Sequence, residues 1–207
     1  MYIQFSEESA GVNTSLQTTY TTLFEVGNRT RTAGFGDLVP SATLLAAMES
    51  EKNGTVVLDI RRQLYELGTA GRGTAAIECT KFMGKNGTAN LDNIPVMRIS
   101  EMYFNRAEAN YFLGKETDAL ADLNTLRTRV GLAELKDLKG AALLAEILKQ
   151  KRIEFAFEGH RWFDMKRLGM DIVKIPSNIP FTDFRILAQI PTGEITNNPN
   201  LKQNFGY

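Results

Sequence analysis

Two consecutive helical segments, each followed by a glycine, constrain this chain more than any other feature of its sequence. Residues 98–131 divide into one segment that ends at Gly114 and another that ends at Gly131. Glycine often follows the end of a helix, because it adopts a left-handed backbone without a steric penalty. Ala107 and Ala119 are small, so the two helices can approach closely. The pattern is typical of a TPR unit, a helix-turn-helix of about 34 residues that needs neighbours to cover its faces.

A third helical segment is predicted over residues 140–168. Its apolar residues fall on two opposite faces of a helical wheel, which are Leu144, Ile147, Leu148, Phe155, Trp162 and Met165 on one face and Ile153, Phe157 and Leu168 on the other. A helix that is apolar on two faces packs between other elements. Lys151 and Glu158 project into the first apolar stripe, where an unpaired charge would cost several kcal/mol. We expect Arg106, on the first TPR-like helix, to pair with Glu158.

The stretch 152–167 contains the one His and the one Trp of the chain. A catalytic His160 would need a nucleophile or a second general acid within reach. Asp164 could orient the imidazole, but Ser and Cys are missing from this stretch of the sequence. We therefore interpret His160 as a surface residue and Trp162 as a core residue. Charges of alternating sign at three- or four-residue spacing form a helix-stabilising ladder, which consists of Glu158, Arg161, Asp164 and Arg167.

The first 97 residues are rich in Thr, Gly, Ser and Asn and predict irregular structure with short elements. Short strands are expected at residues 2–5 and 55–60, and a short helix at residues 41–50 that Ser41 caps. The predicted organisation is an irregular portion over residues 1–97 and a helical portion over residues 98–207, which together form one compact unit. The fold class is mainly α.

Composition excludes several classes of function. Lys plus Arg and Asp plus Glu both total 24, so the net charge is zero and nucleic acid is not expected as a partner. One Cys and one His rule out an internal disulfide and the usual Cys- and His-based metal sites. Cofactors are therefore not expected. The sequence contains neither an apolar run of about 18 residues nor an N-terminal signal-peptide pattern.

Four blocks of residues, in order and at the expected spacing over residues 94–207, resemble the C-terminal half of the SusD/RagB family of outer-membrane glycan-binding lipoproteins. The blocks are Pro95-Val96-x-Arg98 with Glu101 and Ala107-Glu108-Ala109; Leu123-Asn124-x-x-Arg127-x-Arg129; Arg152-x-Glu154 with Glu158, Gly159, Arg161, Trp162, Asp164 and Arg167; and Ile190-Pro191 with Glu194, Gln203-Asn204 and Gly206-Tyr207. A weaker likeness includes Asp59-Ile60-Arg61.

The resemblance implies a TPR-like helical hairpin with a long central helix as the scaffold, and an irregular N-terminal portion with short strands that carries the ligand site. It implies a non-catalytic protein on the cell-surface side of the outer membrane. Its partners would be an oligosaccharide or another nutrient and the barrel of a TonB-dependent transporter. The N-terminal half of the family fold, with its signal peptide and lipid anchor, is expected to be absent from this chain, which would be soluble as given. We expect structural roles for Arg106, Glu154, Glu158, Arg161, Trp162 and Asp164.

Candidate glycan contacts lie in the loops between residues 6 and 40. Aromatic rings stack against the C–H faces of sugars, and polar side chains supply fixed hydrogen bonds. Tyr20 and Phe35 are the aromatic candidates, and Arg31 and Asp37 are the polar ones. An alternative from another class remains, namely a TPR-type adaptor that binds a protein partner through its helical groove.

Overall fold

The structure is a computed structural model of the 207-residue chain. It describes residues 2–3, 22–25, 28–32, 38–67, 77–82, 94–173 and 177–207. The chain divides into two compact units, Met1–Glu154 and Phe155–Tyr207. This boundary falls within the third predicted helical segment.

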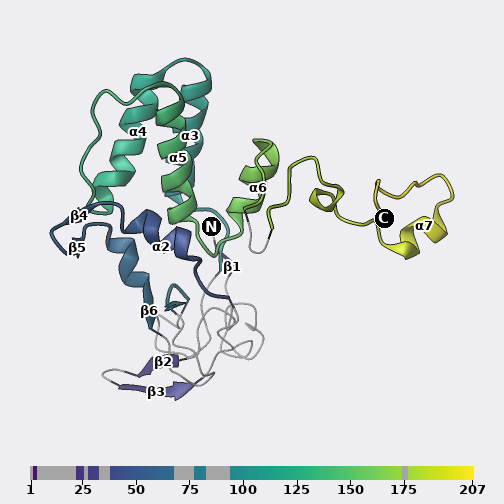
Figure 1. Ribbon diagram of the computed structural model, residues 1–207, viewed down its shortest axis with the longest axis horizontal. Coiled ribbons are helices and arrows are strands. Elements are labelled where there is room, and N and C mark those ends of the chain that lie inside the picture. Colours follow the sequence, from purple (N-terminus) through teal and green to yellow (C-terminus); the bar gives the residue numbers. More distant parts are fainter. Residues whose placement is uncertain are drawn as a thin grey trace. The chain divides into compact units, whose positions relative to one another are not determined.

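Three helices form the body of the first unit: α3 (Ile99–Phe112), α4 (Glu116–Arg129) and α5 (Gly140–Glu154). They lie side by side in Figure 1, and α3 and α4 pack most extensively against each other. Both predicted glycine stops are confirmed, because Gly114 and Gly131 have φ angles of 74° and 85° just beyond α3 and α4.

The helices meet through small and aliphatic residues. Ala107 of α3 and Ala119 of α4 are both 0% exposed, which confirms the predicted close approach of these helices. The rest of the fully covered helical core consists of Phe104, Leu123, Leu143 and Ile147. Burial of side chains of this size stabilises each by about 1.5 to 3 kcal/mol relative to exposure. The packed face of α3 therefore contains Phe104 and Ala107.

Short elements precede the helical body. Helix α2 (Ala42–Met48) begins as predicted, since the Ser41 hydroxyl accepts a hydrogen bond from the Leu44 amide at 3.3 Å. The 3-10 helix η2 (Ile60–Leu64) follows, and the Ile60 amide donates to the Val130 carbonyl at the end of α4. This bond fixes η2 against the helical body.

The strands described are short and form four antiparallel pairs. The pairs are β1 (Tyr2–Ile3) with β8 (Ile94–Pro95), β2 (Thr22–Glu25) with β3 (Asn28–Thr32), β4 (Lys52–Asn53) with β5 (Val56–Val57), and β6 (Tyr65–Leu67) with β7 (Ile77–Cys79). Each pair is too small to fold independently in water. The described part of the chain is thus mainly helical, as predicted.

The prediction of one long central helix is wrong, because the helix is interrupted between Glu154 and His160. Helix α5 ends at Glu154, and α6 (His160–Arg167) begins after five intervening residues. Two of these residues, Phe157 at φ 65° and Gly159 at φ 83°, have left-handed backbones that a right-handed helix cannot contain. The helical wheel therefore does not extend past Glu154. Trp162 was expected in the core, but it is 40% exposed.

The second unit contains α6, the 3-10 helix η3 (Phe184–Ile186) and α7 (Thr192–Asn197). Its tail is held by side chains of the fourth sequence block. The Gln203 amide accepts a hydrogen bond from the Ile190 amide and donates one to the Ile190 carbonyl, both at 2.9 Å. The Tyr207 hydroxyl donates to the Leu187 carbonyl.

Among the residues described, no helix has the length and apolar character that a membrane crossing requires.

Candidate functional site

A buried carboxylate at the end of α5 is surrounded by cationic side chains. We name Arg61, Lys81, Arg98, Arg129 and Glu154 the Glu154 cluster. Glu154 Oε1 accepts hydrogen bonds from Arg98 Nη1 at 2.9 Å and from Arg129 Nη2 at 2.7 Å. Arg61 Nη1 lies 3.3 Å from Glu154 Oε2, and Lys81 Nζ donates to the Glu154 carbonyl oxygen at 2.9 Å. One residue thus joins segments that are far apart in the sequence.

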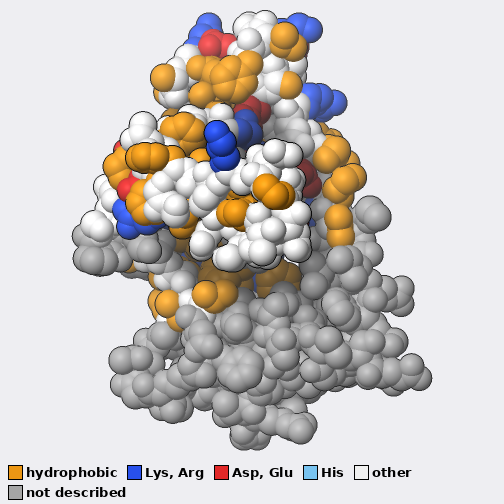
Figure 2. All heavy atoms as spheres, turned by 90° about the vertical axis from the view of Figure 1, so that its right-hand side faces the viewer, with side chains coloured by type: hydrophobic (Ala, Val, Ile, Leu, Met, Phe, Trp, Pro, Cys, Tyr) orange, Lys and Arg blue, Asp and Glu red, His pale blue; other side chains and the backbone are white. Residues whose placement is uncertain are grey.

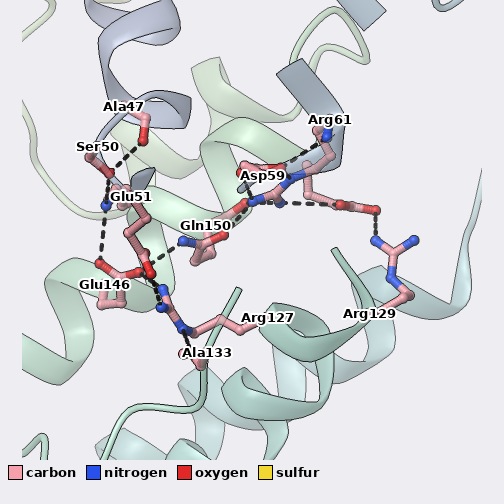
Figure 3. Close-up of polar contacts among 12 residues, drawn as sticks. Ala47, Ser50, Glu51, Asp59, Arg61, Arg127, Arg129, Ala133, Glu146 and Gln150 are labelled. Atoms are coloured by element: carbon pink, nitrogen blue, oxygen red, sulfur yellow. Dashed lines mark hydrogen bonds and ion pairs between the residues drawn. The ribbon is translucent and has the colours of Figure 1, made fainter. Parts of the chain in front are cut away.

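Arg61 is the most rigidly held cation of this cluster. Asp59 caps η2 through the Arg61 amide, and both of its carboxylate oxygens accept from the Arg61 guanidinium, at 2.8 and 2.6 Å. The Gln150 side chain accepts a further bond. Figure 3 shows Arg61 beside Asp59 and Gln150. Because nearly every donor of Arg61 has a partner, its position is fixed.

The charges around Glu154 decide its ionisation. Burial alone would raise the pKa of its carboxyl, but the charge of Arg129, a hydrogen bond from Arg98 and the charges of Arg61 and Arg98 outweigh burial and lower the pKa to about 2. Glu154 is therefore an ionised acceptor at neutral pH. A general acid would need the opposite shift, so Glu154 is suited to hold arginines and unsuited to donate a proton.

A cavity of about 250 Å³ lies against the Glu154 cluster. Its lining consists of Ile60, Arg61, Leu64, Tyr65, Lys81, Arg98, Arg129, Val130, Ile153 and Glu154. Four of these side chains are cationic and one is anionic, and the other five are apolar or aromatic. All belong to the first unit.

A second buried network centres on Arg127, which is 1% exposed. Its guanidinium donates to Glu51 at 2.7 Å, to Glu146 at 2.6 Å and to the Ala133 carbonyl at 3.0 Å. Figure 3 shows Arg127 directed toward these three partners. Every nitrogen of the Arg127 guanidinium thus has a hydrogen-bond partner, and the network ties α4 to α5, so its role is structural.

Arg106 has a partner other than the one expected, and the buried Lys151 pairs with α3. Arg106 forms two hydrogen bonds with Asp122 of α4, at 2.8 and 2.6 Å, so the structure pairs it with Asp122 and not with Glu158. Lys151 is buried as predicted, and its ammonium lies 3.7 Å from the Glu108 carboxylate. Helix α3 thus supplies, through Glu108, the partner of a buried α5 charge, a pairing that the sequence analysis did not predict.

The predicted charge ladder is present in part on α6. Arg167 Nη2 donates to Asp164 at 2.7 Å, and Asp164 is buried. Arg161 is partly exposed and belongs to the same helix.

The ring of His160 stacks on Phe155 with centroids 4.4 Å apart. Within the described ranges, no group of three or more His, Cys, Asp or Glu could hold a metal.

The predicted glycan contacts cannot be placed. Tyr20, Phe35 and Asp37 lie outside the described residues, and for Arg31 the structure describes only the backbone, in β3. The cluster around Glu154 was not predicted as a group, although Arg98 and Arg129 stand in the sequence blocks. The signal that could have found it is that Arg98, Arg129 and Glu154 stand in three different blocks.

Helix α3 also has an exposed apolar face. Ile99 is 71% and Met102 is 42% exposed, and with Tyr103 and Arg106 they line a pocket of about 210 Å³. Helix α3 packs through another face, which carries Phe104 and Ala107. Figure 2 shows one side of the molecule, where hydrophobic side chains lie exposed among polar ones.

Comparisons with known proteins indicate a single family. A sequence model of the SusD family matches residues 76–173. The starch-binding protein SusD of Bacteroides thetaiotaomicron is 31% identical over 128 residues, which are 56% of this chain and 22% of that protein. The SusD-like protein P38 of Formosa agariphila is 26% identical over 77% of this chain and 34% of its own length. The chain therefore spans about a fifth to a third of these relatives.

Solved structures agree on the fold. A SusD-like protein from Bacteroides fragilis superposes with a TM-score of 0.72 at 22% identity, over 100% of this chain and 53% of that one. At this identity the match establishes the fold alone. Most of the Glu154 cluster belongs to the segment that the family model matches. Lys81, Arg98, Arg129 and Glu154 all lie within residues 76–173.

Proposed function

We propose that the protein, whose residues 76–173 match the sequence model of the SusD family, binds an oligosaccharide or another nutrient on the cell-surface side of the outer membrane and passes it to a TonB-dependent transporter. The observation that carries the proposal is the family match over residues 76–173 together with a relative that is a starch-binding protein. The fold is consistent with this role, since a rigid helical body can support loops that contact a ligand.

The proposed glycan contacts are Tyr20, Arg31, Phe35 and Asp37. The antiparallel β2–β3 pair supports treating them as one set. Thr22 and Thr32 are register partners. In the sequence, Tyr20 stands two residues before Thr22 and Phe35 three residues after Thr32. Aromatic stacking on a sugar contributes contact area, and a guanidinium or carboxylate fixes hydroxyl groups.

We propose that binding occurs without turnover. The described polar clusters support this, because Glu154 is held ionised and the buried Arg127 has a hydrogen-bond partner at each of its three guanidinium nitrogens. A retaining glycosidase would need two carboxyl groups about 5 to 5.5 Å apart, one of them with a raised pKa. Incubation with a bound oligosaccharide followed by chromatography should return the oligosaccharide intact. Shorter products would contradict the non-catalytic role.

Affinity electrophoresis and calorimetry with a panel of soluble polysaccharides and neutral oligosaccharides test the binding proposal. We expect at least one glycan to bind the chain, and Tyr20→Ala or Phe35→Ala to weaken that binding about tenfold or more. Phe112→Ala is the matched control, because Phe112 is an aromatic residue of α3 that is 61% exposed. Equal loss in all three variants would contradict the assignment of these contacts.

The same panel of glycans distinguishes the proposed carbohydrate-binding role from the adaptor alternative. An adaptor would use the apolar face of α3 around Ile99 and Met102 to bind a peptide. In that case Ile99→Asp and Met102→Asp would abolish peptide binding and no glycan would bind. The comparisons support the carbohydrate-binding role and give no support to the adaptor.

A further inference from the structure

The cavity beside the Glu154 cluster has the composition of an anion site. Arg61, Lys81, Arg98 and Arg129 line it, and Glu154 is the one carboxylate in the lining. Three guanidinium groups already surround that carboxylate. Asp59, which lies outside the lining, pairs with Arg61. Lys81, Arg98 and Arg129 then stand against the single charge of Glu154, so the lining carries more positive than negative charge and attracts an anion.

Arg129 has donors that remain for a ligand. A guanidinium carries five N–H groups, and Arg129 uses Nη2 for Glu154. Its side chain is 50% exposed, unlike the enclosed Arg61 at 9%. Arg129 is thus anchored at one end of its fork and accessible at the other. A planar, anchored guanidinium suits bidentate binding of an oxyanion.

The wall of the cavity would strengthen such a contact. Ile60, Leu64, Tyr65, Val130 and Ile153 supply the apolar part of the lining. Charge-charge attraction is stronger beside low-dielectric groups than in water. The volume of about 250 Å³ is smaller than that of a typical ligand pocket and suits one small group.

From these observations we propose that the cavity bounded by Arg129, Arg98 and Lys81 binds a singly or doubly charged oxyanion group, a carboxylate or a sulfate. The group could be a free ion or the acidic substituent of a sugar. The proposal does not rest on the proposed carbohydrate contacts. Glu154 sets the position of the arginines, and Arg129 contacts the ligand.

Calorimetric titrations at low ionic strength with sodium sulfate, glucuronate and glucose test the proposal on the whole chain. We expect saturable binding of sulfate or glucuronate and none of glucose. If sulfate binds, a free oxyanion is sufficient as the ligand. If glucuronate binds and sulfate does not, the ligand is a sugar acid. Binding of neither anion, or binding of glucose equal to that of glucuronate, would overturn the proposal.

Two variants test the position of the site. Arg129→Gln removes the exposed cation, and Ile60→Glu adds a negative charge to an exposed residue of the lining that has no part in the polar network. Each should weaken anion binding about tenfold or more. The second variant keeps the test valid if the first unfolds.

Matched controls carry the same chemical changes elsewhere. Arg106→Gln alters an exposed arginine that pairs with Asp122, and Val56→Glu adds a charge at an exposed position of β5. Neither residue lines the cavity, so both variants should bind the anion like the unmodified chain. Anion binding that is unchanged in both Arg129→Gln and Ile60→Glu would place the anion elsewhere and overturn the proposal.

Discussion

Arg129 Nη2 lies 2.7 Å from Glu154 Oε1, so the last residue of α4 is bonded to the last residue of α5. Arg98, just before α3, and Arg61, in η2, bond to the same carboxylate. One end of each of α3, α4 and α5, together with η2, is therefore joined at one buried charge.

Replacing Glu154 by Gln should lower the free energy of unfolding by about 3 kcal/mol. The loss of one partner of a buried ion pair typically costs about 3 to 5 kcal/mol, and the half-exposed Arg129 can regain water, which puts the cost near the lower limit. Chemical denaturation followed by far-ultraviolet circular dichroism measures the change, because the helices dominate that signal. Glu134→Gln, at an exposed position, is the control and should change the free energy by less than about 0.5 kcal/mol.

The stability of the first unit should fall as the pH drops from about 4.5 to about 2. The folded-state pKa of Glu154 is lowered from 4.5 to about 2. Its contribution is therefore fully present above pH 4.5 and is lost as the pH falls through the folded-state value. At about 1.36 kcal/mol per pKa unit the loss is about 3 kcal/mol.

Other carboxylates also titrate in this range, so the difference between the unmodified chain and Glu154→Gln isolates the Glu154 contribution. Denaturation of both proteins at pH 5 and pH 2.5 gives that difference. We expect it to shrink as the pH falls. A difference that stays constant with pH would mean that Glu154 does not titrate as stated.

The sequence predicted the helical hairpin well because local signals determined it. Glycines after α3 and α4, and small residues at 107 and 119, each act within a few residues or across one helix contact. The break after Glu154 was missed because the stretch around Phe157 keeps a helical pattern of apolar residues. A left-handed Phe is unusual, so the sequence gives it little signal.

The polar partners were harder to predict than the helices. The sequence analysis assigned Arg106 of the first TPR-like helix to Glu158 and named no partner for Lys151, and Arg106, Glu108 and Asn110 are all within one turn of each other on α3. Which carboxylate meets which cation depends on the rotation of α3, and that rotation is set by packing of Phe104 and Ala107. The convergence of Arg61, Arg98 and Arg129 on Glu154 is likewise a long-range result.

The Lys151–Glu108 pair should behave as a coupled unit. Its charged atoms are 3.7 Å apart, and both side chains are 7% exposed. Lys151→Met or Glu108→Gln alone leaves a buried charge without this partner and should cost about 3 to 5 kcal/mol, whereas the double variant should cost less than the sum.

A double-mutant cycle by chemical denaturation measures the coupling. The exposed pair Arg185–Asp183 is the control and should show a much weaker coupling, because solvent screens its charges. Additive single effects at Lys151 and Glu108 would show that the two charges do not interact.

Two glycines with similar backbones should respond differently to a methyl group. Gly131 and Gly114 have φ angles of 85° and 74°, so alanine at either position incurs a left-handed backbone cost of about 1 to 2 kcal/mol. An added Cβ at Gly131 would lie 2.9 Å from the Leu58 carbonyl oxygen, whereas one at Gly114 has nothing within 4 Å. Gly131→Ala should therefore be the more destabilising substitution, because η2 and the segment before it must move away from α4. Denaturation midpoints of the two variants measured side by side test this, and equal midpoint shifts would contradict the close approach of Leu58 to Gly131.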